Sequence, residues 1–134
     1  MKSTTDIITD LFPFINVVGI TSLIDGEVYR QSRRVDSQLN DVVIGSIANN
    51  NSRIQEVNLV INGFVKNLDK GMPDEATLSA IEEAIVSILE TLDNDGMFSI
   101  MVVNTTQYPD VDRDGWWYTS IRFVIEVPNI TLKT

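Results

Sequence analysis

Between residues 74 and 127 the spacing of the apolar side chains changes from a helical period to a strand period. The first part places six large aliphatic residues on one helical face: Leu78, Ile81, Ile85, Ile88, Leu89 and Leu92. After a polar connection at residues 93–96, apolar residues alternate with others over residues 98–103 and again over residues 120–127. This order predicts one amphipathic helix lying across an antiparallel sheet.

The preceding residues add one helix and three strands. A helix is expected over residues 5–16, kinked or shortened by Pro13. Strands are expected at residues 27–31, 41–48 and 53–65, with a polar irregular segment at 32–40, a turn at 49–51 and a loop at 67–73 before the N-cap Asp74. The predicted fold class is α+β, in the order α-β-β-β-α-β-β, with two helices packed on one face of a mainly antiparallel sheet.

Composition removes several classes of function. With 134 residues, 43% of them hydrophobic, the chain can bury one core, so a single domain over residues 1–134 is expected. The chain contains no cysteine and no histidine, which excludes thiolate chemistry, disulfides and the usual general base near neutral pH. No spacing of serine, lysine or carboxylate residues points to catalysis, so a non-enzymatic protein is expected.

The chain is acidic, with a net charge of −9. That charge disfavours binding to phosphate backbones. No apolar run is long enough to span a membrane, and Asp6 and Asp10 interrupt any signal-peptide core, so we expect a protein made in a cytoplasm.

One loop carries alternating carboxylates. Asp110, Asp112 and Asp114 precede Gly115 in the sequence DVDRDG, which matches the opening of a calcium-binding loop. The twelfth position of such a loop should be glutamate but is Ile121 here, and strands rather than helices flank it. A solvated turn is therefore favoured over a weak Ca²⁺ site, and no other cofactor is expected.

Aromatic residues follow this loop. If Ile121 and Phe123 face the helices, the alternation turns Trp117 inward and places Trp116 and Tyr118 on the opposite face. Other apolar residues are expected beside them: Val60, Phe64, Met101, Val103 and Val124. Such a patch is typical of an interface, with Trp116 and Tyr118 as anchors, unless loops of the same chain fold over it.

Charge is unevenly distributed along the chain. Acidic residues accumulate over residues 69–95, including Glu82 and Glu83, whereas residues 30–34 are basic. A protein with one acidic and one basic surface suits head-to-tail contacts between copies. The expected contact residues on the basic side are Arg30, Arg33, Arg34 and Arg53, with Arg33 and Arg34 against the acidic helix of a neighbouring copy.

Three segments carry a resemblance to a known family. They are Asp25-Gly26-Glu27-Val28-Tyr29-Arg30, the stretch from Ser37 to Ile44 with its Asp41-Val42-Val43-Ile44 ending, and Gln55-Glu56-Val57-Asn58-Leu59-Val60-Ile61. With the acidic-faced helix and final hairpin, they resemble the neck and tail-terminator (head–tail joining) proteins of tailed bacteriophages over most of residues 5–127. The chain departs from that pattern at Arg33-Arg34, where a proline-containing turn is common, and in its DVDRDG loop.

The resemblance implies a structural protein of the virion. Such a protein forms or joins a ring in the neck or tail, a hexamer or a dodecamer, contacts other neck and tail proteins, and surrounds the DNA passage without reading its sequence. Two other possibilities stay open: a stand-alone binding module that uses the Trp116 and Tyr118 face, and a domain stabilised by calcium at residues 110–115.

Overall fold

The computed structural model describes residues 3–51 and 54–128 as an α+β fold. Its helices are α1 (Thr4–Ile15), α2 (Val18–Thr21), the 3-10 turn η1 (Asp69–Gly71) and α3 (Glu75–Asn94). Its strands are β1 (Val28–Arg30), β2 (Asp41–Asn51), β3 (Ile54–Lys66), β4 (Ser99–Pro109) and β5 (Trp116–Pro128). The predicted fold class is therefore confirmed.

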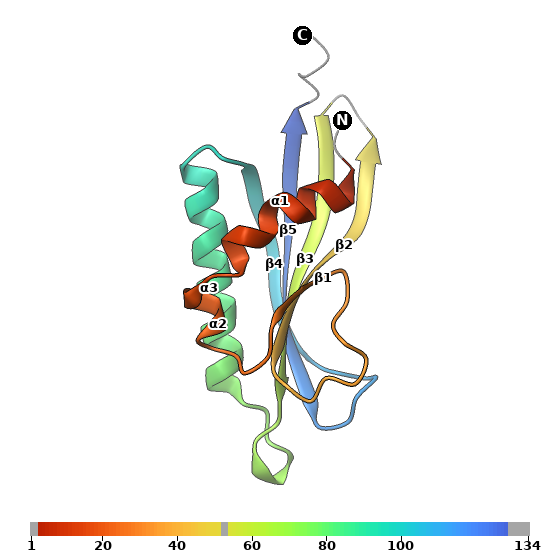
Figure 1. Ribbon diagram of the computed structural model, residues 1–134, viewed down its shortest axis with the longest axis vertical. Coiled ribbons are helices and arrows are strands. Elements are labelled where there is room, and N and C mark those ends of the chain that lie inside the picture. The colour runs from red at the N-terminus through yellow and green to blue at the C-terminus, as the bar shows by residue number, and fades with distance from the viewer. Residues whose placement is uncertain (1–2, 52–53, 129–134) are drawn as a thin grey trace.

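The strands form one five-stranded sheet in the order β1-β2-β3-β5-β4. Every neighbouring pair is antiparallel except β1 and β2, which run parallel. The last strand, β5, lies in the interior of the sheet between β3 and β4 (Figure 1). As a result, β1 and β4 are the two edge strands.

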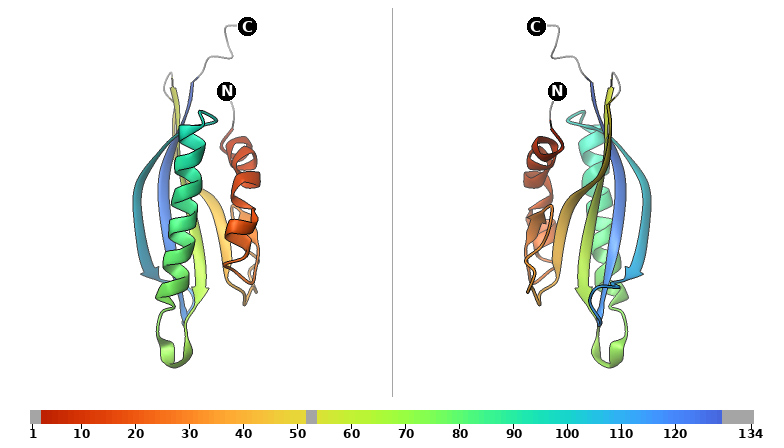
Figure 2. Two further views of the ribbon diagram at one scale, coloured as in Figure 1. Left: turned by 90° about the vertical axis from the view of Figure 1, so that its left-hand side faces the viewer. Right: turned by 90° about the vertical axis from the view of Figure 1, so that its right-hand side faces the viewer.

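Helices α1 and α3 lie on the same side of the sheet (Figure 2). The aliphatic face of α3 is buried against the sheet at Leu78, Ile81, Ile85, Leu89 and Leu92. These side chains join those of α1 and the inward residues of the strands in one hydrophobic cluster. Burial of each large aliphatic side chain contributes roughly 1.5–3 kcal/mol to the free energy of folding.

Polar side chains define where the helices begin. The hydroxyl of Ser3 accepts a hydrogen bond from the Asp6 amide at 3.1 Å, and the Asp6 carboxylate accepts one from the Ser3 amide, which completes a capping box. Asp74 caps α3 by accepting from the Thr77 amide at 3.2 Å. Pro13 lies inside α1, in its last turn, and the helix ends two residues later at Ile15.

One local expectation was wrong, and one short helix was not predicted. Residues 49–51 do not form a turn, because Asn49, Asn50 and Asn51 pair with the first residues of β3 and extend β2. A register shift between Ser46 and Ala48 precedes this extension. Antiparallel pairing with the next strand of the hairpin therefore overrides the turn preference of the three asparagines. The short helix α2 carries no sequence signal that was recognised, and only its Ile20 is buried.

The other side of the sheet carries no helix from the described ranges 3–51 and 54–128 (Figure 2). We call this side the outer face. The loops at residues 31–40, 67–73 and 110–115 lie toward one end of the molecule, away from the end where β2 stops and β3 begins (Figure 1). A backbone hydrogen bond joins two of these loops, since the Asn67 amide donates to the Gly115 carbonyl at 2.9 Å.

Candidate functional site

The alternation predicted for β5 is confirmed. Trp117 packs against the hydrophobic core, as do the buried Ile121 and Phe123. Trp116 and Tyr118 consequently project from the outer face. The alternation over residues 120–127 also predicts that Val127 faces the helices, but the side chain of Val127 lies outside the part of the chain that the structure describes.

An aromatic row crosses three strands of the outer face. Tyr118 of β5 lies opposite Phe64 of β3 and opposite Tyr108 of β4. Its ring centroid is 5.4 Å from the centroid of Phe64 and 5.4 Å from that of Tyr108. Such spacing is favourable for aromatic pairs, so the row ties the three strands together.

Arginine side chains cover one end of this row. The Arg33 guanidinium lies 4.6 Å from the ring centroid of Phe64 and 4.7 Å from that of Trp116. Arg113 lies 4.3 Å and the Lys66 ammonium 5.9 Å from the Trp116 ring. Trp116 is only 5% exposed. The expectation that Trp116 anchors a partner is therefore wrong for this conformation, because the chain's own loops cover the ring.

The buried carboxylate of Asp41 holds in place the loop at residues 31–40, which carries Arg33 over the aromatic row. Asp41 is completely buried and accepts hydrogen bonds from the Ser37 hydroxyl at 2.5 Å and from the Glu27 amide at 3.0 Å. Its other neighbour is the Arg33 guanidinium, whose Nε lies 3.4 Å from Oδ2. Asp41, the first residue of β2, thereby joins the loop at residues 31–40 to Glu27, the residue before β1.

Gly26 is needed beside this carboxylate. A Cβ atom on Gly26 would lie only 2.5 Å from the Asn40 carbonyl oxygen and closer still to the Asp41 carboxylate. Any side chain at position 26 would force the loop and the buried acid apart. The close approach explains the Asp25-Gly26 pair in terms of packing as well as turn geometry.

Arg33 is consequently not available for a neighbouring copy, which contradicts its predicted role in contacts between copies. Its side chain is 11% exposed, and it also donates to the Ser37 carbonyl at 3.2 Å. Burial lowers the pKa of the Arg33 guanidinium, while Asp41 acts in the opposite direction. An arginine remains charged despite such a shift, so the buried pair is ionic.

The other predicted basic contacts differ in exposure. The side chain of Arg34 is 68% exposed and lies 3.6 Å from Asp36 in a surface pair. Arg30 is exposed, with its guanidinium 5.3 Å from the Phe12 ring centroid and 3.4 Å from the Thr9 hydroxyl. Arg53 lies outside the described residues. Arg30 and Arg34 thus remain as exposed cations of this region.

The rest of the outer face keeps part of the apolar patch expected from the sequence. Val60 and Val124 are half-buried, whereas Met101 and Val103 are exposed. Met101 lies directly opposite Val124, and Val103 sits at a register shift in β4. This part of the face is not covered by any helix of the described ranges, so it can contact another molecule.

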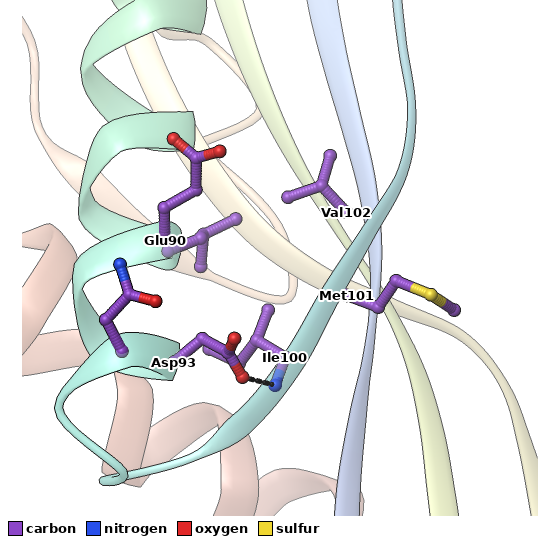
Figure 3. A pocket seen from close by; sticks show the side chains of 7 residues that line it. Glu90, Asp93, Ile100, Met101 and Val102 are labelled. Atoms are coloured by element: carbon purple, nitrogen blue, oxygen red, sulfur yellow. Dashed lines mark hydrogen bonds between the residues drawn. The ribbon is translucent and has the colours of Figure 1, made fainter.

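Glu82 and Glu83, the predicted acidic contacts, have different surroundings. Glu82 is half-buried and accepts a hydrogen bond from the buried Thr119 hydroxyl at 3.0 Å, so it does not lie on a purely solvated face. Glu83 is exposed. Both carboxylates border a groove between α3 and β4, which continues past Glu90 toward Asp93 (Figure 3).

The DVDRDG loop forms a turn closed by its own backbone. The Asp110 carboxylate accepts a hydrogen bond from the Asp112 amide at 3.0 Å, and Gly115 adopts a positive φ of 85°. Among the residues that the structure describes, no three acidic side chains come close enough together to hold a metal ion. These observations favour the turn interpretation of Asp110, Asp112 and Asp114.

We therefore expect calcium to leave the melting temperature unchanged. Differential scanning calorimetry with saturating Ca²⁺ and with chelator should give the same transition, because a ligand stabilises only the state that binds it. The Asp112→Asn variant is the matched control. A rise in melting temperature that grows with Ca²⁺ concentration and disappears in this variant would contradict the expectation.

Sequence reasoning missed the structural importance of Asp41, and the chain does contain a signal for it. Asp41 stands directly before the apolar run Val42–Ile44, a strand that is not expected to be solvated on both faces. A carboxylate at such a position is expected to be buried with a partner. Asp93 was also missed: its carboxylate accepts a hydrogen bond from the Ile100 amide at 2.9 Å and so connects the end of α3 to the start of β4.

Within the described part of the chain, no helix has the length and the apolar character required to cross a membrane. Compared with known proteins, the chain matches no protein-family model and no curated protein sequence.

Proposed function

We propose that this chain is a non-enzymatic structural protein of a bacteriophage virion, part of the head–tail connector in the neck or tail. In this role copies of the chain form or join a ring, as a tail terminator does. The resemblance over residues 5–127 suggests this assignment, and the α+β architecture with both helices on one face is compatible with it.

The observation that carries the proposal is the outer face of the sheet. A face that exposes Met101 and Val103 next to half-buried Val60 and Val124, with no helix from the described residues over it, is suited to contact with another protein. The absence of histidine and cysteine from the sequence also favours assembly over catalysis. The partners in this proposal are further copies of the chain and other neck or tail proteins.

The acidic character of the chain suits a passage for DNA. A net charge of −9 gives little attraction for the phosphate backbone, so DNA can move through a ring without being held. No sequence-specific contact with DNA is proposed. The location that follows is the virion, after synthesis in the cytoplasm of the bacterial host.

Size-exclusion chromatography with light scattering tests the proposal. The expected result is a six- or twelve-fold species, seen as rings by negative-stain electron microscopy, over a range of protein concentrations. A strict monomer at every concentration would contradict self-assembly into a ring. A monomer would instead favour a stand-alone binding module that uses the exposed part of the outer face near Tyr118.

A further inference from the structure

The groove between α3 and β4 has an apolar floor and an acidic border. One hollow of about 480 Å³ is lined by residues that include Glu90, Asp93 and Met101, and a second of about 320 Å³ is lined by residues that include Glu83. The two hollows share Glu90 and Val102, so they form one groove along the helix. In Figure 3, Glu90 of α3 and Val102 of β4 point toward the space between the two elements.

The strand beside the groove is an edge strand. Among the described strands β4 pairs only with β5, so one side of its backbone faces away from the sheet. Near the start of β4 the Ile100 amide already donates a hydrogen bond to the Asp93 carboxylate. The register shift between Val102 and Asn104 interrupts the regular pairing of β4 with β5. Both features discourage the pairing of a long second strand, so a shorter segment is the better occupant of this groove.

The negative charge along the border of the groove determines which kind of segment can bind there. Glu83 and Glu90 are exposed and form no ion pair with another described residue, while Glu82 and Asp93 add two more carboxylates to the same groove. Two copies meeting groove to groove would bring these acids together, and such like-charge contacts are unfavourable. A cationic segment with an apolar side chain fits both the border and the floor.

The chain itself presents such a segment on its other side. Arg34 is 68% exposed, and among the described residues it forms an ion pair only with the exposed Asp36, a kind of pair that contributes little. The next residue, Val35, is 99% exposed. The loop that carries Arg34 and Val35 lies on the right in Figure 1, whereas α3 and β4 lie on the left.

We propose that the groove between α3 and β4 binds the loop at residues 32–36 of a second copy of this chain. Val35 packs on the floor near Val86 and Val102, and Arg34 pairs with Glu83 and Glu90. Because the loop and the groove lie on opposite sides of one molecule, each copy can bind one neighbour and be bound by another, which closes into a ring when the rotation allows. The inference rests on the proposed ring and adds the contact that would build it.

Engineered cysteines test which surfaces meet, since the native chain contains no cysteine. Val35→Cys labels the loop and Thr105→Cys labels the groove, at two exposed positions. After treatment with a short bismaleimide, a mixture of the two single variants should give a crosslinked dimer. Neither variant alone should give one, and a chain carrying both cysteines should give a ladder of multimers.

The matched control for Val35→Cys is Val18→Cys, which places a cysteine at another highly exposed valine outside the loop. Mixed with Thr105→Cys, it should give no dimer. A dimer from Thr105→Cys alone would show groove-to-groove contact and overturn the inference. Lack of a Val35–Thr105 crosslink in a sample that light scattering shows to be a ring would overturn the inference while leaving the ring intact.

Charge reversal provides an independent measurement. Arg34→Glu or Glu90→Arg should weaken assembly by about tenfold or more, and the two changes together should restore it. Both positions are exposed, so the monomers should keep their melting temperatures. Assembly that is indifferent to all three variants would overturn the inference, and a wild-type chain that is monomeric at every concentration would overturn the inference and the proposed ring together.

Discussion

Replacing Ile85 by aspartate is expected to abolish folding. Ile85 is completely buried in the middle of α3, where it faces the sheet in the hydrophobic cluster. The substitution removes about 1.5–3 kcal/mol of apolar burial and places a carboxylate where no basic partner lies within the described cluster. Together these costs approach the total stability of a typical domain, which is about 5–15 kcal/mol.

Far-ultraviolet circular dichroism and thermal melting of the purified Ile85→Asp variant measure this effect. Ser87→Asp is the matched control, because it adds the same charge to the same helix at an exposed position. The control should melt within a few degrees of the wild type. A soluble Ile85→Asp variant with a cooperative thermal transition would show that the buried face of α3 has been misinterpreted.

Replacing Asp41 by alanine is expected to produce the second largest effect. The change leaves the Arg33 guanidinium buried without its carboxylate and removes the acceptor of the Ser37 hydroxyl and of the Glu27 amide. Breaking a buried ion pair in this way costs about 3–5 kcal/mol of folding free energy. The melting temperature should fall by on the order of 10–20 °C.

A double-mutant cycle with Arg33→Leu separates the ion pair from the other contacts. Removal of both charges should cost less stability than the sum of the two single changes. Each single variant leaves one buried group without its partner, whereas the double variant leaves none. Asp36→Ala is the matched control: its carboxylate is paired with Arg34 at the surface, and its loss should change stability by less than about 1 kcal/mol. Strict additivity of Asp41→Ala and Arg33→Leu would contradict the coupling.

Local sequence patterns predicted the elements whose residues are close together in the chain. The aliphatic spacing around Ile85 marked α3 and its buried face, and strict alternation assigned Trp116 and Trp117 to opposite sides of β5. Asp74 was recognisable as an N-cap because its partner, Thr77, is three residues away. In each case the physical cause is contained in a window of a few residues.

Contacts between distant segments could not be predicted in this way. Arg33 covers Trp116 across more than 80 positions of sequence, so its burial depends on the sheet order and not on the local pattern. The parallel pairing of β1 with β2 likewise depends on the order of the strands in the sheet and not on the local pattern. For the candidate site, this means that the sequence indicated a patch on the outer face, while only the structure shows which part of that patch the chain itself covers.

The position of β5 in the sheet has a consequence for the synthesis of the protein. β3 leaves the ribosome well before residues 116–128, which must pair along its whole length. Until β5 arrives, the edge of β3 that faces it is open to other nascent chains, and the pairing that closes it is non-local and therefore slow. A chain interrupted before residue 116 would expose a 13-residue strand edge, so premature termination should yield aggregates and not a smaller folded protein.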